Sequence, residues 1–387
     1  MKEALVAVGL GLLLVVGSIA GLFWNEGRSI QTTRSLAEGG AMVIEADPAR
    51  IEPGNDGKLV HVTGELKTTA PLKDPDFLVE AQAARLLRKV EMYQWKEESR
   101  SETRKTAGGG EERVTTYSYR RTWAENRIDS NRFHNRFGHE NPEMRYKARE
   151  VLATDATLGA FRPGAAALHR LPTPQELTLQ PALGEALKSK FGASPIEVAG
   201  DRIFLGANSA SPRIGDLRIT FSLAPNGSAS FIARQEGRDL TEYQTRAGDK
   251  LLLAAIGDVT ATAMFKQAED ENRLVTWIIR LIGVVAMAFG WYLTLQWIGV
   301  VGDIVPFLGG LLQAGAGIVA ALVTAVLAPL VIALAWMWYR PMVSLAVLAG
   351  GAAVAYGLRR IAKRRAAARP AAADAPTMSQ ATPAAPA

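Results

Sequence analysis

Cysteine is absent from this chain of 387 residues, and histidine occurs only four times. Without cysteine the protein has no disulfide, no thiolate metal ligand and no cysteine nucleophile. His134 and His139 are five residues apart, which fits neither the i, i+4 histidines of a zinc-protease helix nor a zinc finger. The sequence also lacks a phosphate-binding glycine loop and a Gly-x-Ser-x-Gly elbow. We therefore expect a protein that is not an enzyme and that binds no cofactor or metal.

Most of the sequence has no excess of positive or negative charge. The formal net charge is +6, and the same number of basic residues follows the last apolar run: Arg359, Arg360, Lys363, Arg364, Arg365 and Arg369. With this basic cluster set aside the chain is close to neutral, so we expect no nucleic-acid partner. A basic cluster beside an apolar run is typical of the cytoplasmic side of a membrane protein, and it can also attract anionic lipids.

Long apolar runs are confined to the two ends of the chain. They predict four transmembrane helices, over residues 4–23, 274–298, 313–338 and 342–358. The first run would be about 30 Å long as a helix, which is enough to cross the hydrocarbon core. Arg280 is expected at headgroup level beside Trp277, where its charge is tolerated. Two alternatives stay open: a cleaved signal peptide for the first run, and two short spans within residues 304–339.

The middle of the chain, residues 25–272, contains no further apolar span and is rich in strand signals. Three antiparallel hairpins are predicted: Val90–Glu98 with Val114–Trp123, Gly215–Ala224 with Ser228–Arg234, and the two halves of Ile196–Leu205. Pro225-Asn226-Gly227 supplies turn chemistry for the second of them. Helices are predicted over Ala81–Arg88 and Glu176–Phe191. The expected fold class is a membrane protein with one plus three helical spans and a large α+β domain rich in hairpins.

The orientation follows from the number of spans and from the basic cluster. Four spans place both termini on one side of the membrane, and the basic cluster assigns that side to the cytoplasm. The α+β domain is then extracytoplasmic. Residues 359–387 continue from the basic cluster into an Ala/Pro-rich segment, for which we predict disorder in the cytoplasm.

Two groups of residues are candidates for protein contacts. Gly17 and Gly21 in the first span, and Gly351 and Ala355 in the last, are small-residue pairs that let helices approach closely. Aromatic residues gather on the first predicted hairpin: Tyr93, Trp95, Tyr117, Tyr119 and Trp123. We expect one face of this hairpin to contribute to the core and the other to form a contact surface.

Several segments resemble the LUMA family, also called the transmembrane protein 43 family. They are GKLVHVTGEL at 57–66, VEMYQW at 90–95, TYSYRRTW at 116–123, FGHENP at 137–142 and WYRP at 338–341. The resemblance extends over nearly the whole chain up to Leu358. It implies a non-enzymatic membrane protein with one N-terminal span, a large domain and three further spans.

The resemblance also implies a function. In animals the domain of this family lies in the endoplasmic reticulum or perinuclear lumen, where the protein self-associates and scaffolds envelope proteins. The high Ala, Gly and Arg usage here indicates a bacterial member, for which we expect the cytoplasmic (inner) membrane and a periplasmic domain. We therefore predict a homo-oligomeric scaffold or membrane-organising protein that contacts membrane lipids and unidentified membrane or periplasmic proteins. The alternatives are a pore or transporter component and, less favoured, a lipid- or envelope-modifying enzyme.

Overall fold

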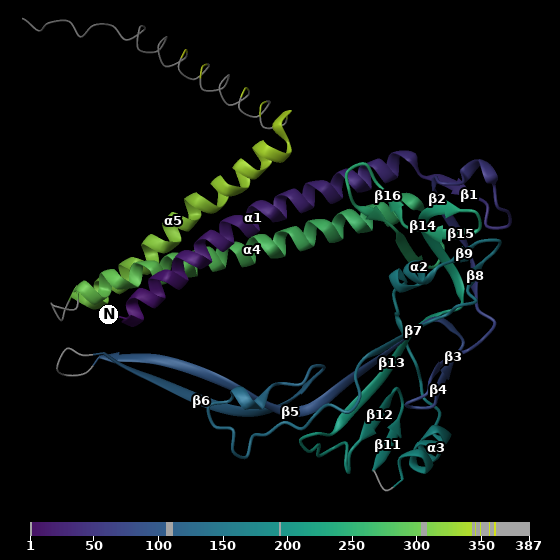
Figure 1. Cartoon of the computed structure of the whole chain (residues 1–387), viewed down its shortest axis with the longest axis horizontal. Coiled ribbons are helices and arrows are strands. Elements are labelled where there is room, and N and C mark those ends of the chain that lie inside the picture. Colours follow the sequence, from purple (N-terminus) through teal and green to yellow (C-terminus); the bar gives the residue numbers. More distant parts are fainter. Residues whose placement is uncertain are drawn as a thin grey trace, which may run out of the picture.

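Three long helices and a β-rich domain make up the chain in its computed structural model (Figure 1). The structure describes residues 2–105, 111–192, 195–302 and 308–342, together with the single positions 345, 349, 356 and 360. The predicted span over 342–358 and the predicted tail over 359–387 therefore lie almost entirely outside the described residues. The same is true of Gly351, of Ala355 and of the basic cluster except Arg360.

Three helices among the described residues are long and apolar enough to span a membrane. Helix α1 runs from Lys2 to Met42, α4 from Ala261 to Gly302 and α5 from Leu308 to Tyr339. Helix α4 begins in the polar segment before the predicted second span and enters that span without a break. Residues 308–339 form one helix with Pro329 inside it, not two short spans.

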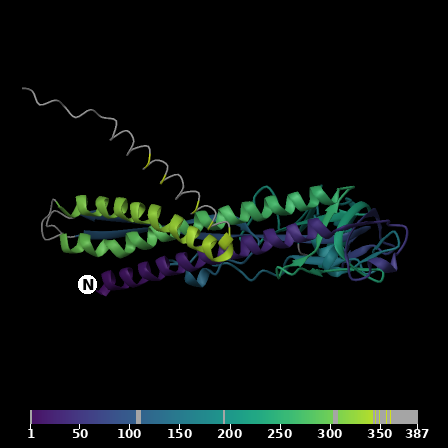
Figure 2. The ribbon, with the colours of Figure 1, turned by 90° about the horizontal axis from the view of Figure 1, so that it is seen from above.

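The first helix does not end where its apolar run ends. The polar residues after Phe23 predicted a boundary there and a domain beginning at residue 25, but α1 continues to Met42. Its polar side chains find partners on α4: Asn25 Nδ2 donates to the Thr276 carbonyl at 3.2 Å, and Arg28 Nη1 donates to Asn272 Oδ1 at 3.0 Å. Residues 25–42 of α1 and 261–276 of α4 thus form a two-helix stalk that joins the spans to the domain (Figures 1 and 2).

Two seven-stranded sheets build most of the described domain. The first has the order β1-β2-β14-β15-β9, with β8 on β2 and β18 on β14. Its strands are β1 (Ile44–Ala46), β2 (Leu59–Lys67), β8 (Thr157–Leu158), β9 (Arg162–Pro163), β14 (Gly227–Glu236), β15 (Asp239–Thr241) and β18 (Leu253–Ile256). The second has the order β11-β12-β13-β5-β6, with β10 on β13 and β7 on β5. Its strands are β5 (Ala83–Lys105), β6 (Glu111–Ala124), β7 (Arg149–Leu152), β10 (Gln175–Glu176), β11 (Ile196–Ala199), β12 (Arg202–Leu205) and β13 (Leu217–Pro225).

Smaller elements complete the described part of the domain. Strand β3 (Leu72–Asp74) pairs with β4 (Val79–Ala81), and β16 (Tyr243–Gln244) pairs with β17 (Lys250–Leu251). The short helices are α2 (Ala165–Arg170), α3 (Ala182–Phe191) and two 3-10 turns at Pro53–Asn55 and Ser130–Arg132. The predicted α+β class with antiparallel strands is confirmed.

One of the three predicted hairpins is wrong. Strands β13 and β14 follow each other directly, yet β13 pairs with β5 and β12 whereas β14 pairs with β2, β15 and β18. The chain therefore passes from one sheet into the other at Asn226 instead of reversing. Gly227 adopts a φ of +140°, and Asn226 Oδ1 accepts a hydrogen bond from Thr68 at 3.2 Å. Pro225-Asn226-Gly227 thus form the turn at which the chain passes from one sheet into the other. The hairpins β5–β6 and β11–β12 form as predicted.

The helix predicted over Ala81–Arg88 is also wrong. Strand β5 begins at Ala83, and its residues 85–88 pair with β7 on one edge and with β13 on the other. Two flanking strands override the local helix preference of an Ala/Leu/Arg sequence. Of the helix predicted over Glu176–Phe191, the structure forms α3 from Ala182 onward, and Glu176 lies in β10.

The apolar core lies between the two large sheets and draws residues from both. Phe77, Phe161, Phe221 and Phe231 are its largest fully buried side chains. Beside it Arg88 Nη1 lies 2.8 Å from a carboxylate oxygen of Asp74 and 2.8 Å from one of Asp76. The hydrogen bond from Arg88 holds the pKa of Asp76 below its usual value. This buried charge pair ties the β3–β4 turn to the central strand β5.

Candidate interaction surfaces

The β5–β6 hairpin brings all five predicted aromatic residues onto one face. Its register places Tyr93 opposite Trp123, Trp95 opposite Arg121, Glu97 opposite Tyr119 and Ser99 opposite Tyr117. Because side chains alternate along a strand, every one of these residues points to the same side. The expected division into a core face and a contact face therefore does not separate the aromatic residues. Met92 is the last residue of β5 that pairs with β13, and beyond it the hairpin projects from the sheet (Figure 1).

The loop over residues 126–143 covers this aromatic face. The imidazole of His134 stacks on Tyr117 with ring centroids 4.0 Å apart, and that of His139 stacks on Tyr119 at 3.8 Å. Glu97 Oε2 accepts hydrogen bonds from the Tyr119 hydroxyl and from the His134 backbone N–H, both at 2.6 Å. The two histidines thus act as packing partners of tyrosines. No group of three potential metal ligands occurs among the described residues.

The hydrogen-bonded Tyr119 is held in its neutral form. The pKa of the Tyr119 hydroxyl is raised above its usual value, mainly by desolvation and secondly by the hydrogen bond to Glu97. A protonated hydroxyl donates to Glu97 and accepts from the backbone N–H of Asn135 at 2.8 Å. These contacts hold the covering loop in place, and Phe137 in this loop is 89% exposed. Phe137 is thus a large apolar side chain exposed on this surface, and the sequence analysis did not single it out.

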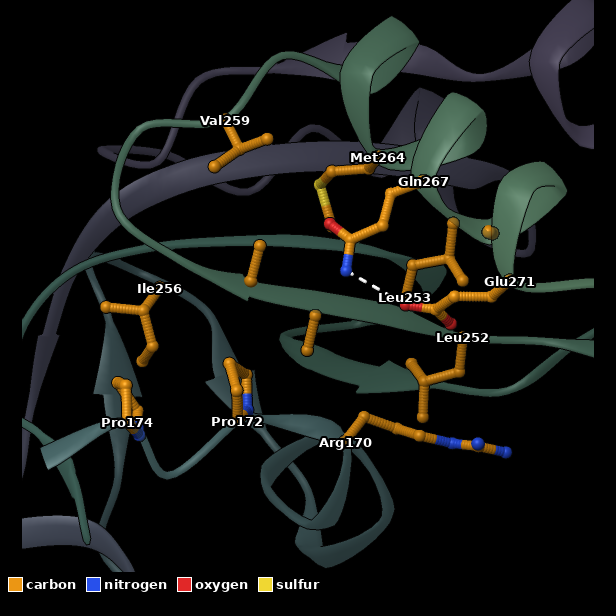
Figure 3. Close-up of a pocket in the computed structure, with 13 residues that line it drawn as sticks. Arg170, Pro172, Pro174, Leu252, Leu253, Ile256, Val259, Met264, Gln267 and Glu271 are labelled. Atoms are coloured by element: carbon orange, nitrogen blue, oxygen red, sulfur yellow. Dashed lines mark hydrogen bonds between the residues drawn. The ribbon is translucent and has the colours of Figure 1, made fainter. Parts of the chain in front are cut away.

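A second surface is a cavity of about 640 Å³ between the edge strand β18 and helix α4 (Figure 3). Leu253 and Ile256 lie along the strand, Met264, Gln267 and Glu271 project from α4, and Arg170, Pro172 and Pro174 form the opposite wall. Gln267 donates to Glu271 at 2.9 Å. The lining is mostly apolar, with one basic and one acidic side chain.

The edge of β18 at this cavity is open. Gly257 N–H donates to the Ser228 carbonyl, and Ile256 is opposite Ala229. In an antiparallel pair of strands, hydrogen-bonded and non-hydrogen-bonded residue pairs alternate. Ala254 and Ile256 therefore belong to non-hydrogen-bonded pairs, and their backbone N–H and C=O groups point away from β14. They have no hydrogen-bond partner in the described part of the chain. In the neighbouring segment Pro172 and Pro174 have no N–H to donate to the β18 carbonyls.

The predicted glycine pair of the first span makes no helix contact within the described residues. A Cβ atom built on Gly17 or Gly21 meets nothing within 4 Å. The glycines at the α1–α4 contact are others: a Cβ on Gly290 would lie 2.8 Å from the Gly11 carbonyl oxygen, and one on Gly283 would lie 2.7 Å from Leu22. Gly283 and Gly290 are seven residues apart, which places them on the same face of α4. This spacing was the signal in the sequence for the contact.

A polar cluster ties all three helices together where the spans meet the stalk. The Glu26 carboxylate on α1 accepts two hydrogen bonds from Arg280 on α4 and one from the Trp336 indole on α5, each at 2.7 Å. The Glu26 side chain is 2% exposed. Arg280 also lies 4.8 Å from the ring of Trp277. The predicted pairing of Arg280 with Trp277 is present, and the carboxylate partner was missed.

Comparison with known proteins identifies the family. A family model described as transmembrane protein 43 matches residues 92–341. Mouse transmembrane protein 43 is 32% identical over 346 residues, covering 86% of this chain and 84% of that protein. This chain belongs to the transmembrane protein 43 family. The resemblance seen in the sequence is thereby confirmed.

Other members of the transmembrane protein 43 family align over similar lengths. The human protein is 33% identical over 351 residues, covering 87% of this chain and 85% of its own length. A homolog from Drosophila melanogaster is 29% identical over 353 residues, covering 88% and 91%. No solved structure matches the chain. The family match begins at Met92, and so contains the projecting hairpin, β18 and the helices α4 and α5.

Proposed function

We propose that this membrane protein is a non-enzymatic scaffold whose domain holds an extended segment of a partner protein. The observation that carries the proposal is the open edge of β18 beside the cavity in Figure 3. An exposed edge offers unpaired N–H and C=O groups, to which a peptide can add as a further strand. The apolar lining gives pockets for alternate side chains of such a peptide.

The stalk supports this proposal because it presents the domain in a fixed position. Ser35 on α1 and Thr245 between β16 and β17 share a buried hydrogen bond of 2.9 Å. Leu36, Leu251 and Phe265 pack in one apolar cluster that joins α1, β17 and α4. A partner held at β18 is therefore coupled to the membrane through packed helices and not through a flexible linker.

Substitution of one edge residue tests the proposal. Ala254→Pro removes an N–H that does not pair with β14, and proline is tolerated at such edge positions. Loss of one hydrogen bond, with the ring in the path of an added strand, is expected to weaken partner binding about tenfold. Ala254→Val keeps the N–H and is expected to bind as the parent does. The measurement is affinity capture of crosslinked complexes from membranes, followed by identification of the peptide attached near β18.

The outcomes of this capture are distinct. A partner segment crosslinked to the parent and to Ala254→Val, but not to Ala254→Pro, supports strand addition. Two differently tagged copies of the chain report whether the partner is a second copy, which would be self-association. Equal capture by Ala254→Pro and the parent, with unchanged thermal unfolding, rejects the β18 edge as the binding site.

The orientation is a further part of the proposal. We place the domain in the periplasm of a bacterial cytoplasmic membrane, with both termini in the cytoplasm, on the strength of the basic residues at 359–369. An alkaline phosphatase fused after Ala387 is expected to be inactive because that enzyme folds only outside the cytoplasm. Strong phosphatase activity of this fusion contradicts the orientation, whereas a fluorescent protein fused at the same place serves as the expression control.

A further inference from the structure

A polar cleft lies on the stalk at the height of the membrane interface. Interfacial tryptophan and tyrosine residues mark this height, and here Trp24 and Trp277 are each 61% exposed and Trp338 is 75% exposed. The cleft has a volume of about 300 Å³ and lies between α1, the end of α5 and the segment that carries Asp249. Arg28, Gln31, Arg34 and Tyr339 contribute to its lining.

Two arginines of this cleft lack a carboxylate partner. Arg28 donates to three neutral oxygens, on Asn25, Asn272 and Thr276, and its Nε atom has no hydrogen-bond partner. Arg34 donates to the main-chain carbonyl of Tyr339. Within the described ranges neither guanidinium lies within 4.0 Å of a carboxylate, in contrast to Arg280 nearby.

The acidic residues near the cleft accept hydrogen bonds from groups other than Arg28 and Arg34. Asp249 lines the cleft but accepts its hydrogen bond from Gln31 at 2.7 Å. Glu26 is occupied by Arg280 and Trp336. Glu38 accepts from the backbone N–H of Arg246. Because its lining holds two arginines and one aspartate, the cleft keeps a net positive charge, and it lies beside the exposed Trp24.

We propose that this cleft binds the phosphate group of an anionic phospholipid. Guanidinium groups bind phosphate by charge-assisted hydrogen bonds, and the exposed Arg34 has donors left for them. Trp24 lies about one helical turn nearer the membrane than Arg28, so the acyl chains of the same lipid run down beside its ring. A soluble phosphate shares the headgroup chemistry, but it gains nothing from the position of the cleft at the interface.

Binding is tested with the full-length protein in a neutral detergent. A short-chain phosphatidylglycerol is expected to raise the midpoint of thermal unfolding, whereas phosphatidylcholine with the same acyl chains and inorganic phosphate are expected to leave it unchanged. Arg34→Gln is expected to weaken the apparent affinity for phosphatidylglycerol about fivefold, and Arg28→Gln with Arg34→Gln about 25-fold. Arg273→Gln, an exposed arginine of α4 that does not line the cleft, is the matched control and is expected to bind as the parent does.

Three results overturn the proposal. The first is equal stabilisation by phosphatidylglycerol and phosphatidylcholine. The second is an affinity for phosphatidylglycerol that Arg34→Gln leaves unchanged; this single variant decides the question if the double variant fails to fold, since Arg34 is exposed and makes one hydrogen bond. The third is equal stabilisation by inorganic phosphate, which assigns the cleft to a soluble anion.

Discussion

Replacement of Glu26 by glutamine is expected to lower the free energy of unfolding by about 3–5 kcal/mol, the usual cost of removing one partner of a buried ion pair. The carboxylate has two hydrogen bonds to Arg280 and one to Trp336, and it is almost fully buried. Glutamine keeps the shape of the side chain but leaves the charge of Arg280 without its counter-ion. Denaturant titration of the protein in mixed micelles, followed by tryptophan fluorescence, measures the change.

A double-mutant cycle separates the interaction between Glu26 and Arg280 from a general loss of packing. Glu26→Leu combined with Arg280→Met replaces both charges by apolar groups, and such replacements are often neutral in stability. The double variant is therefore expected to be more stable than either single variant, with a coupling free energy of about 1–3 kcal/mol. Glu269→Gln, at an exposed position of α4, is the control and is expected to have no measurable effect. Additive losses in the double variant contradict the assignment of a charge pair.

Replacement of Gly290 by leucine is expected to destabilise the helix pair by about 1–3 kcal/mol or more, because it inserts a side chain into a filled contact. A Cβ atom at this position would lie 2.8 Å from the Gly11 carbonyl oxygen and 3.0 Å from the Val15 backbone nitrogen. Both neighbours belong to the main chain of α1, so no side-chain rotation relieves the contact. The helices have to separate.

The control for this substitution lies on the same pair of helices. Gly17→Leu adds the same side chain at a position where nothing lies within 4 Å. It is expected to leave the unfolding midpoint in detergent unchanged, whereas Gly290→Leu is expected to lower it. A larger effect of Gly17→Leu than of Gly290→Leu contradicts the α1–α4 contact at Gly290 and assigns the packing face to the Gly17–Gly21 side.

The candidate surfaces show why sequence reasoning found some residues and missed others. The five hairpin aromatics were visible as a cluster, and their register on one face follows from strand alternation once the pairing is known. The open edge of β18 produced no recognisable sequence pattern, because which edge of β18 is covered depends on its pairing with β14. Pro172 and Pro174 were a usable signal only after their neighbour was known. The same is true of Arg28 and Arg34, whose lack of a carboxylate partner is a property of the folded chain.

The sequence by itself determined that this is a membrane protein of the transmembrane protein 43 family with an α+β domain, because span length and strand alternation are local properties of the chain. Only the tertiary structure decided that α1 continues past Phe23, since its polar side chains are satisfied by α4. It also decided that residues 217–236 change sheet instead of forming a hairpin. The turn residues Pro225-Asn226-Gly227 suit a hairpin as well as a change of sheet. The outcome depends on which strands are available to pair with β13 and β14.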